Sequence, residues 1–270
     1  MHINGKLHLR LQLIDAVTNF PFKDKFILAK DFEPESIKAY IKESIKDLPL
    51  NTIVSDGHLA YPKIIQELGA NQQSCQFHIM ENLMFHHLKI INNKNRTIKR
   101  NTTKIKNKEQ TIEKMKQDKK EKEYRKPTLK KRKEKLRKLR IEVKKLKNEN
   151  RRIKKEIKAF NKIKDQISKL LGSKSIKTAT KRLEKIKSNI EDYHEIYQNC
   201  IRKIEKQWDQ VTLCMKNRQV PNTNNKIELY FNVTLFKPLK RKYRTLKGIM
   251  QHTELKRQRW IRRNTNLKIT

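Results

Sequence analysis

Residues 52–62 have the sequence TIVSDGHLAYP, which combines a short strand, a turn and the start of a helix. The run Thr52–Val54 is rich in β-branched residues and predicts a strand with Asp56 at its carboxyl end. Gly57 marks a turn after it, and residues 61–68 predict a helix. Ligands gather where the strands of an open α/β sheet end. The stretch therefore predicts an α/β fold that places a carboxylate at a position suited to function.

The segment before this stretch predicts strands followed by a helix. Residues 7–15 alternate apolar and polar side chains, which is the two-residue period of a strand. Asn4-Gly5 is a strong hairpin-turn signal, so residues 1–3 are expected to end a preceding strand. A weaker alternation covers residues 20–28. Pro34 then opens an amphipathic helix that is expected to end before Pro49.

From about residue 79 to 214 the sequence becomes Lys-rich and helical. Its main apolar seam has the three-and-four spacing of heptads: Leu136, Leu139, Val143, Leu146, Ile153, Ile157, Phe160, Ile167 and Leu171. Asn150 and Lys164 occupy core-type positions of this seam, where a polar residue usually fixes register. A weaker seam precedes it, through Met84, Leu88, Ile91, Ile98, Ile105 and Ile112. Pro127 separates the two arms, so we expect an antiparallel coiled-coil hairpin.

The composition indicates a polyanionic partner. The chain has 67 Lys and Arg against 28 Asp and Glu, a formal net charge of +39. Such a surface binds nucleic acid through its phosphates. A membrane is the competing polyanion, but the sequence has no apolar run of about 18 residues, so we expect no membrane partner.

Glycine, cysteine and the N-terminal sequence exclude other classes. The five glycines are scattered and form no phosphate-binding loop, so no nucleotide cofactor is expected. Three cysteines at unrelated spacings imply no disulfide framework. The N-terminus lacks the apolar region of a signal peptide, and we expect a cytoplasmic protein.

Two carboxylates are candidates for metal-dependent chemistry. An Asp-Gly pair is most often a turn, and most helical Glu residues are simply solvated. Asp56 follows a predicted strand, however, and Glu228 lies in a predicted helix after the loop at residues 221–225. Carboxylates at strand and helix ends can share divalent metal ions in phosphoryl transfer. The pair is therefore more informative than either residue alone.

Cys75 and His78 have the spacing of half a zinc site. A structural zinc needs four ligands in a tetrahedral arrangement, and His86 and His87 could supply the other two. The alternative is a buried thiol beside a hydrogen-bonded histidine. The sequence favours this second interpretation, since it offers one Cys-His pair.

Three motifs together carry a family resemblance. They are Ser55-Asp56-Gly57-His58-x-Ala60-Tyr61-Pro62, then Cys75-x-x-His78-x-x-x-Asn82, then Asn224-Asn225-x-Ile227-Glu228-x-Tyr230-Phe231. This combination resembles the DDE transposases of insertion sequences, in particular the Mutator-like branch and its archaeal relatives. The resemblance covers residues 1–90 and 215–265, whereas the middle is similar only in being helical and basic.

The resemblance implies an α/β fold with a ribonuclease H-like mixed-sheet core, interrupted by a long all-α insertion. Residues 1–78 would form the N-terminal part of this core. Residues 79–214 would form the coiled-coil insertion. Residues 215–270 would complete the core and add a basic, DNA-binding tail.

The resemblance also implies a catalytic site that uses Mg²⁺ or Mn²⁺. Asp56 matches the second catalytic Asp and Glu228 the closing Glu, and both would bind metal. Cys75 and His78 match the family's Cys-x-x-His pair. The first catalytic Asp lies on a strand that would here precede Met1, and Asp15 matches an acidic residue at the end of the second strand. We therefore expect an N-terminally truncated relative that lacks the family's N-terminal DNA-recognition domain and has impaired catalysis.

The sequence thus predicts a transposase-like protein that binds DNA and forms a homo-oligomer. Intact relatives cleave DNA strands and transfer them. The alternative is a non-catalytic, basic coiled-coil protein that binds nucleic acid. The cations and aromatics assigned to DNA contact are Arg241, Arg244, Arg257, Arg259, Trp260, Arg262 and Arg263.

Overall fold

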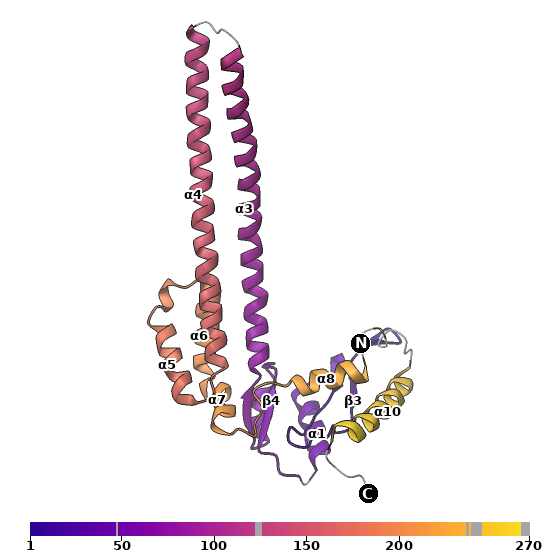
Figure 1. Cartoon of the computed structure of the whole chain (residues 1–270). Helices are drawn as coiled ribbons and strands as arrows, with labels where there is room; N and C mark the ends of the chain where they lie inside the picture. The colour runs from indigo at the N-terminus through magenta and orange to yellow at the C-terminus, as the bar shows by residue number, and fades with distance from the viewer. Residues whose placement is uncertain (47, 122–125, 236–237, 239–244, 266–270) are drawn as a thin grey trace. The chain divides into compact units, whose positions relative to one another are not determined.

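The computed structural model describes residues 1–46, 48–121, 126–235, 238 and 245–265 (Figure 1). Within these ranges the chain is mostly helical and has two small sheets. It divides into two compact units. Unit 1 comprises residues 1–81, 170–184 and 200–270, and unit 2 comprises residues 82–169 and 185–199. The prediction of a long helical insertion within a β-containing chain is confirmed.

Unit 1 begins with the hairpin that Asn4-Gly5 predicts. β1 (His2–Ile3) and β2 (Lys6–Leu11) pair antiparallel, with positive φ angles of 48° at Asn4 and 74° at Gly5 in the turn. β3 (Lys25–Leu28) pairs antiparallel with the opposite edge of β2. The first sheet therefore has the order β1-β2-β3.

The second sheet of unit 1 is a parallel pair. β4 (Thr52–Ser55) and β5 (Asn71–Ser74) run in the same direction, joined by α2 (Tyr61–Glu67). Parallel strands need such a crossover. α1 (Pro34–Ile45) precedes β4 and packs with α2 over a shared apolar cluster. That cluster contains Leu11, Ile37, Tyr40, Ile41 and Ile64, with Ile27 and Ile53 packed against it, so residues from both sheets contribute.

Two of the later helices of unit 1 pack on these strands and on each other. α7 (Trp208–Lys216) contacts β5 through the fully buried Gln73, whose Oε1 accepts a hydrogen bond from the Cys214 backbone at 2.8 Å. α8 (Asn225–Thr234) packs against α10 (Leu246–Asn264). The hydroxyl of Thr245 caps α10 by accepting a hydrogen bond from Gly248.

Unit 2 is dominated by the pairing of α3 (Gln76–Glu121) with α4 (Lys126–Leu171), which lie side by side in Figure 1. The contacts between the two helices pair increasing residue numbers on α3 with decreasing residue numbers on α4. They are Lys94 with Glu156, Asn101 with Asn150, and Lys108 with Glu142. The two helices are therefore antiparallel, and the seven-residue steps along α3 are those of a heptad repeat.

α5 (Ile176–Lys187) and α6 (Glu195–Lys206) follow α4. The start of α6 joins unit 2 through the Tyr197 hydroxyl, which lies 2.7 Å from Nδ1 of His87. Burial, followed by the charge of Lys164, lowers the pKa of His87. None of the described helices combines the length and apolar character that crossing a lipid bilayer requires.

Candidate functional site

Asp56 lies where the parallel strands end. The carbonyl oxygen of Ser55 accepts a hydrogen bond from the Cys75 backbone at 2.8 Å, so the segments after β4 and β5 leave the sheet as neighbours. Oδ1 of Asp56 accepts the amide of His58 at 3.0 Å, which fixes a tight turn. Gly57 has a φ of 85°, a conformation that favours glycine. The turn holds the Asp56 carboxylate at an exposed position at the sheet edge.

Cys75 connects this edge to the start of α8. Its buried thiol donates to Oδ1 of Asn224 at 3.1 Å and accepts the Asn224 amide at 3.4 Å. A second connection lies beside it, because the Gln76 backbone donates to the carbonyl of Asn222 at 2.9 Å. The loop before α8 is thus held against the end of β5. This Cys75 clasp brings the segments that carry Asp56 and Glu228 to the same edge.

Glu228 lies on the first turn of α8 and faces His78. Its Oε1 atom is 3.4 Å from Nε2 of His78, and Oε2 of Glu81 is 3.9 Å from the same nitrogen. Oε1 of Glu228 and Nδ1 of His78 are buried and have no hydrogen-bond partner among the residues that the structure describes. Buried polar atoms are usually satisfied, so an incompletely satisfied pair is a candidate for ligand contact.

Asp15 caps a turn near the N-terminal end of α8. Its two carboxylate oxygens accept the amides of Val17 and Thr18, each at 3.1 Å. Burial alone would raise the pKa of Asp15, but a hydrogen bond from the Thr18 hydroxyl, the two amide hydrogen bonds and the charge of Lys226 lower it overall. Lys226 also donates to the carbonyl of Ala16 at 2.7 Å. Asp15 therefore remains ionised beside the helix that carries Glu228.

A cavity of about 690 Å³ joins the three segments within unit 1. Asp15 lines it from the first segment, Val54 of β4 from the second, and Asn224 and Lys226 from the third. Asp56 and Glu228 stand next to these lining positions in the sequence but do not line the cavity themselves. The structure thus brings together the segments that the sequence selects.

The carboxylates do not form a complete metal-ligand set in the part of the chain that the structure describes. No three His, Cys, Asp or Glu side chains gather there closely enough to hold an ion. The thiol of Cys75 is engaged with Asn224, which agrees with the interpretation of a buried thiol. Asp56 and Glu228 remain as two oxygen donors of the type that Mg²⁺ and Mn²⁺ prefer.

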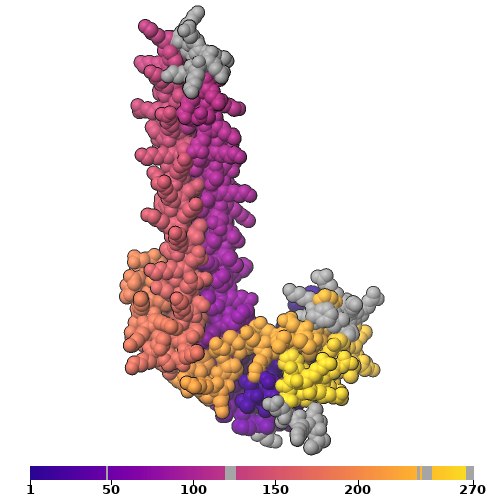
Figure 2. All heavy atoms as spheres, in the orientation of Figure 1, coloured from indigo at the N-terminus to yellow at the C-terminus, as the bar shows by residue number. Residues whose placement is uncertain are grey.

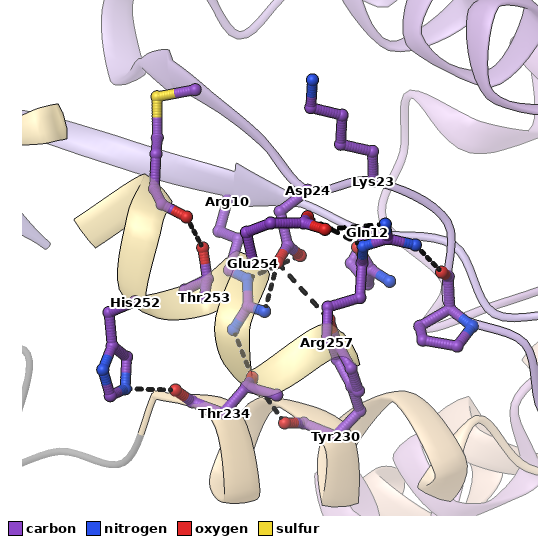
Figure 3. Close-up of polar contacts among 12 residues, drawn as sticks. Arg10, Gln12, Lys23, Asp24, Tyr230, Thr234, His252, Thr253, Glu254 and Arg257 are labelled. Atoms are coloured by element: carbon purple, nitrogen blue, oxygen red, sulfur yellow. Dashed lines mark hydrogen bonds and ion pairs between the residues drawn. The ribbon is translucent and has the colours of Figure 1, made fainter. Parts of the chain in front are cut away.

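Sequence reasoning missed a buried ion pair behind α8 (Figure 3). The Arg10 guanidinium makes a bidentate contact with Asp24, through Nε at 2.8 Å and Nη2 at 2.7 Å. Nη1 donates to Thr234 of α8 at 2.8 Å, and the guanidinium lies over the ring of Tyr230 at 5.1 Å. The Arg10 and Asp24 side chains are 7% and 5% exposed. The pair anchors α8 to the first sheet.

α10 joins this network through Arg257. Its guanidinium donates to Glu254 at 2.8 and 2.9 Å and to the carbonyl of Pro21 at 3.2 Å. Arg257 lowers the pKa of Glu254 through these hydrogen bonds, although burial opposes the effect. Trp260 is buried, donates to the carbonyl of Asn19 at 3.2 Å and packs edge-on against Tyr230. Both residues thus have structural partners within unit 1.

The remaining residues assigned to DNA contact differ in exposure. Arg259, Arg262 and Arg263 are exposed on α10. Arg241 and Arg244 lie outside the described residues. The exposed arginines are therefore the members of this set that are free to meet a phosphate backbone.

No known protein-family profile and no solved structure matches this chain. The chain is similar to the "insertion element ISM1 uncharacterized 48.3 kDa protein" of Methanobrevibacter smithii, with 28% identity over 96 residues. The match covers 36% of this chain and 23% of that protein. The chain thus spans less than a quarter of the length of the relative that it matches.

Proposed function

We propose that this chain is a transposase-like, DNA-binding protein of a mobile element. The observation that carries the proposal is the Cys75 clasp, which holds the start of α8 against the edge where Asp56 leaves β4. The similarity to an insertion-element protein supports the same conclusion. A net charge of +39 suits a protein that acts on a polyanion.

We further propose that unit 1 derives from a ribonuclease H-like core. Along the chain, its first elements are a β-hairpin with a third strand, then a helix, a strand, a second helix and a further strand. Antiparallel and parallel strands both occur, in two separate sheets, and α1 and α2 pack against residues of both sheets. The helical insertion precedes the helix that carries Glu228, which is its place in the DDE transposases that the motifs resemble.

In this proposal Asp56 and Glu228 are the ligands of Mg²⁺ or Mn²⁺. The metal ion, when bound, would supply Lewis-acid stabilisation of the phosphodiester that is cleaved. His78 contacts Glu228 and would hold its carboxylate toward the site. Because no third carboxylate joins them among the described residues, we propose that strand cleavage by this chain is weak.

The second candidate is a basic coiled-coil protein that binds nucleic acid without cleaving it. The incomplete ligand set favours it, since two carboxylates without a third ligand among the described residues hold metal ions weakly. The paired α3 and α4 helices supply the extended basic surface that such a protein needs.

A plasmid-nicking assay separates the two candidates. The whole chain is incubated with supercoiled DNA and either Mg²⁺ or Mn²⁺, and the nicked fraction is compared with that of Asp56→Asn and Glu228→Gln. The matched control is Glu43→Gln, which removes a surface carboxylate that pairs with Lys25. We expect slow, metal-dependent nicking that both site variants abolish and the control retains.

The other outcomes are equally informative. Duplex binding without metal-dependent nicking would favour the non-catalytic candidate. Nicking that survives both site variants would show that Asp56 and Glu228 are not its ligands. The absence of duplex binding at low salt would contradict both candidates.

A further inference from the structure

α4 carries a continuous cationic stripe along one side. Up to Lys158 its members follow the alternating three-and-four spacing of heptads, and one more cation follows four residues later: Lys126, Lys130, Lys133, Arg137, Arg140, Lys144, Lys147, Arg151, Lys154, Lys158 and Lys162. Asn161 occupies the next heptad position, so the strict alternation ends at Lys158. At a rise of about 1.5 Å per residue, it extends over about 54 Å with one cation every 5 Å or so. The stripe is therefore a straight row of like charges on a single helix.

The acidic residues in the middle of α4 lie away from this side, whereas Glu134 follows Lys133 directly and pairs with Lys138. Most stripe members lie one position after a seam residue, whereas Glu142, Glu149 and Glu156 lie one position before one. Glu142 and Glu156 reach across to α3, where they pair with Lys108 and Lys94. One flank of the helix pair thus has the cross-helix ion pairs of Glu142 and Glu156, and the opposite flank of α4 carries the cationic stripe.

The stripe is exposed and largely without protein counter-charges. Every member is exposed to solvent, and side chains project from the α3–α4 pair along its length (Figure 2). Among the described residues, Lys147 is the member that has an ion pair, with Glu109 at 2.7 Å. A groove of about 330 Å³ runs among Lys133, Arg140 and Lys144, with apolar Leu136 and Ile141 beside them.

Such a row is unfavourable for the helix by itself. Like charges three and four residues apart repel each other along a helix. Scattering the same number of cations among the acidic residues would reduce that repulsion. The segregation of charge, together with the scarcity of counter-charges among the described residues, is complementary to a linear polyanion.

We propose that the α4 stripe is a phosphate track that binds duplex DNA lengthwise. The proposal rests on the DNA-binding function proposed above and assigns that function to one face of unit 2. Duplex DNA presents about one phosphate per 1.7 Å of its axis, counted over both strands around the helix. A straight row with cations about 5 Å apart therefore meets phosphates wherever a backbone strand crosses it. The track contacts phosphates and not base edges, and therefore binds without sequence preference.

A matched pair of variants tests the track. Lys133, Lys144, Lys154 and Lys158 are changed to Gln in one variant. In the control, Lys131, Lys135, Lys145 and Lys155 of the same helix, which are also exposed, are changed to Gln. Both variants lose four charges, and Gln has nearly the helix propensity of Lys. Circular dichroism verifies that helix content is retained in each.

The measurement is the affinity of the whole chain for a 20-base-pair duplex over a series of salt concentrations. Each phosphate contact contributes about 0.9 to the slope of log affinity against log salt. The stripe variant should lose about 3 to 4 from the magnitude of that slope, and the control variant about 1 or less. In a second measurement, lysine acylation followed by mass spectrometry should show duplex protection of Lys133 and Lys144 but not of Lys131 and Lys135.

Equal effects of the two variants would overturn the track and leave the proposed DNA binding intact, because total charge would then explain the affinity. Tighter binding to a single strand of the same length would overturn the assignment to duplex DNA. If the unmodified chain does not bind DNA, the proposed function itself fails, and that failure is visible before either variant is compared.

Discussion

Among the described ion pairs of unit 1, Arg10 and Asp24 have the least exposed side chains, at 7% and 5%. Two unit charges taken out of water lose a large hydration free energy, which close pairing and further hydrogen bonds must offset. The bidentate geometry, the Thr234 hydroxyl and the Tyr230 ring supply those interactions. Thr234 and Tyr230 lie on α8 near Glu228, so the pair fixes the helix that carries the candidate site.

Arg10→Met is expected to destabilise the chain by about 3–5 kcal/mol, because it leaves the Asp24 carboxylate buried without its partner. The double variant Arg10→Met/Asp24→Leu should recover most of that loss, since it removes both charges. Lys25→Met, which breaks the exposed pair with Glu43, should cost about 0–1 kcal/mol. Urea unfolding of the three variants measures these differences. A loss in Arg10→Met no larger than in Lys25→Met would contradict the anchoring role.

At the residue scale, the sequence predicted local motifs and missed distant partners. Asp56, Cys75 and Glu228 belong to short motifs, and the structure brings their segments together. Arg10 occupies a polar position of an alternating strand, where a charged side chain is usually solvated. Its partners lie 14 and 224 positions away in the sequence, so no local pattern connects them. The same limit explains why the burial of Trp260 was not foreseen.

Among the elements, the α3–α4 pair contains a polar contact in an otherwise apolar seam. Nδ2 of Asn101 donates to Oδ1 of Asn150 at 3.1 Å, and Asn101 is 5% exposed. Ile105, Ile112 and Val143 form the neighbouring apolar cluster. A polar residue at a core position fixes register at a cost in stability, which is the role predicted for Asn150.

Replacing Asn150 alone by Leu should leave the buried Asn101 amide without a partner and destabilise the helix pair by about 1–3 kcal/mol. Replacing both Asn101 and Asn150 by Leu should restore or exceed the original stability, because no polar group is then stranded. Hydrogen exchange of backbone amides within residues 94–108 and 142–156 reports this local stability. Faster exchange in the double variant than in the single one would show that the contact is not a register-setting pair.

Element types were predictable where the periodicity was strong. The hairpin, α1, β4, α2 and the antiparallel helix pair follow from alternation, turn signals and heptads. β5 was missed because Asn71–Ser74 lacks β-branched and aromatic residues and is stabilised by its neighbours. The prediction of the weaker seam in α3 was wrong at Leu88, which is 49% exposed, whereas Leu83 and His87 are buried. In that part of α3 polar residues dilute the heptad pattern, and packing decides which face is buried.

The whole molecule consists of a small α/β unit and a basic helical unit. The α/β unit places Asp56 and Glu228 at one edge, and the helical unit carries most of the exposed cations. Neither unit by itself accounts for a net charge of +39, because the exposed arginines of α10 belong to unit 1. Both units are therefore expected to contact the same polyanion.

An equilibrium titration of the whole chain with two duplexes of unrelated sequence, repeated over a salt series, measures whether phosphate contacts dominate DNA binding. Both duplexes should bind with similar affinity, and the affinity should fall steeply with salt, by about 0.9 logarithmic units per contacted phosphate for each decade of salt. Replacing Arg259, Arg262 and Arg263 by Ala should reduce the magnitude of the slope by about 2 to 3. An affinity that is insensitive to salt, or a strong preference for one duplex, would contradict the claim that phosphate contacts dominate.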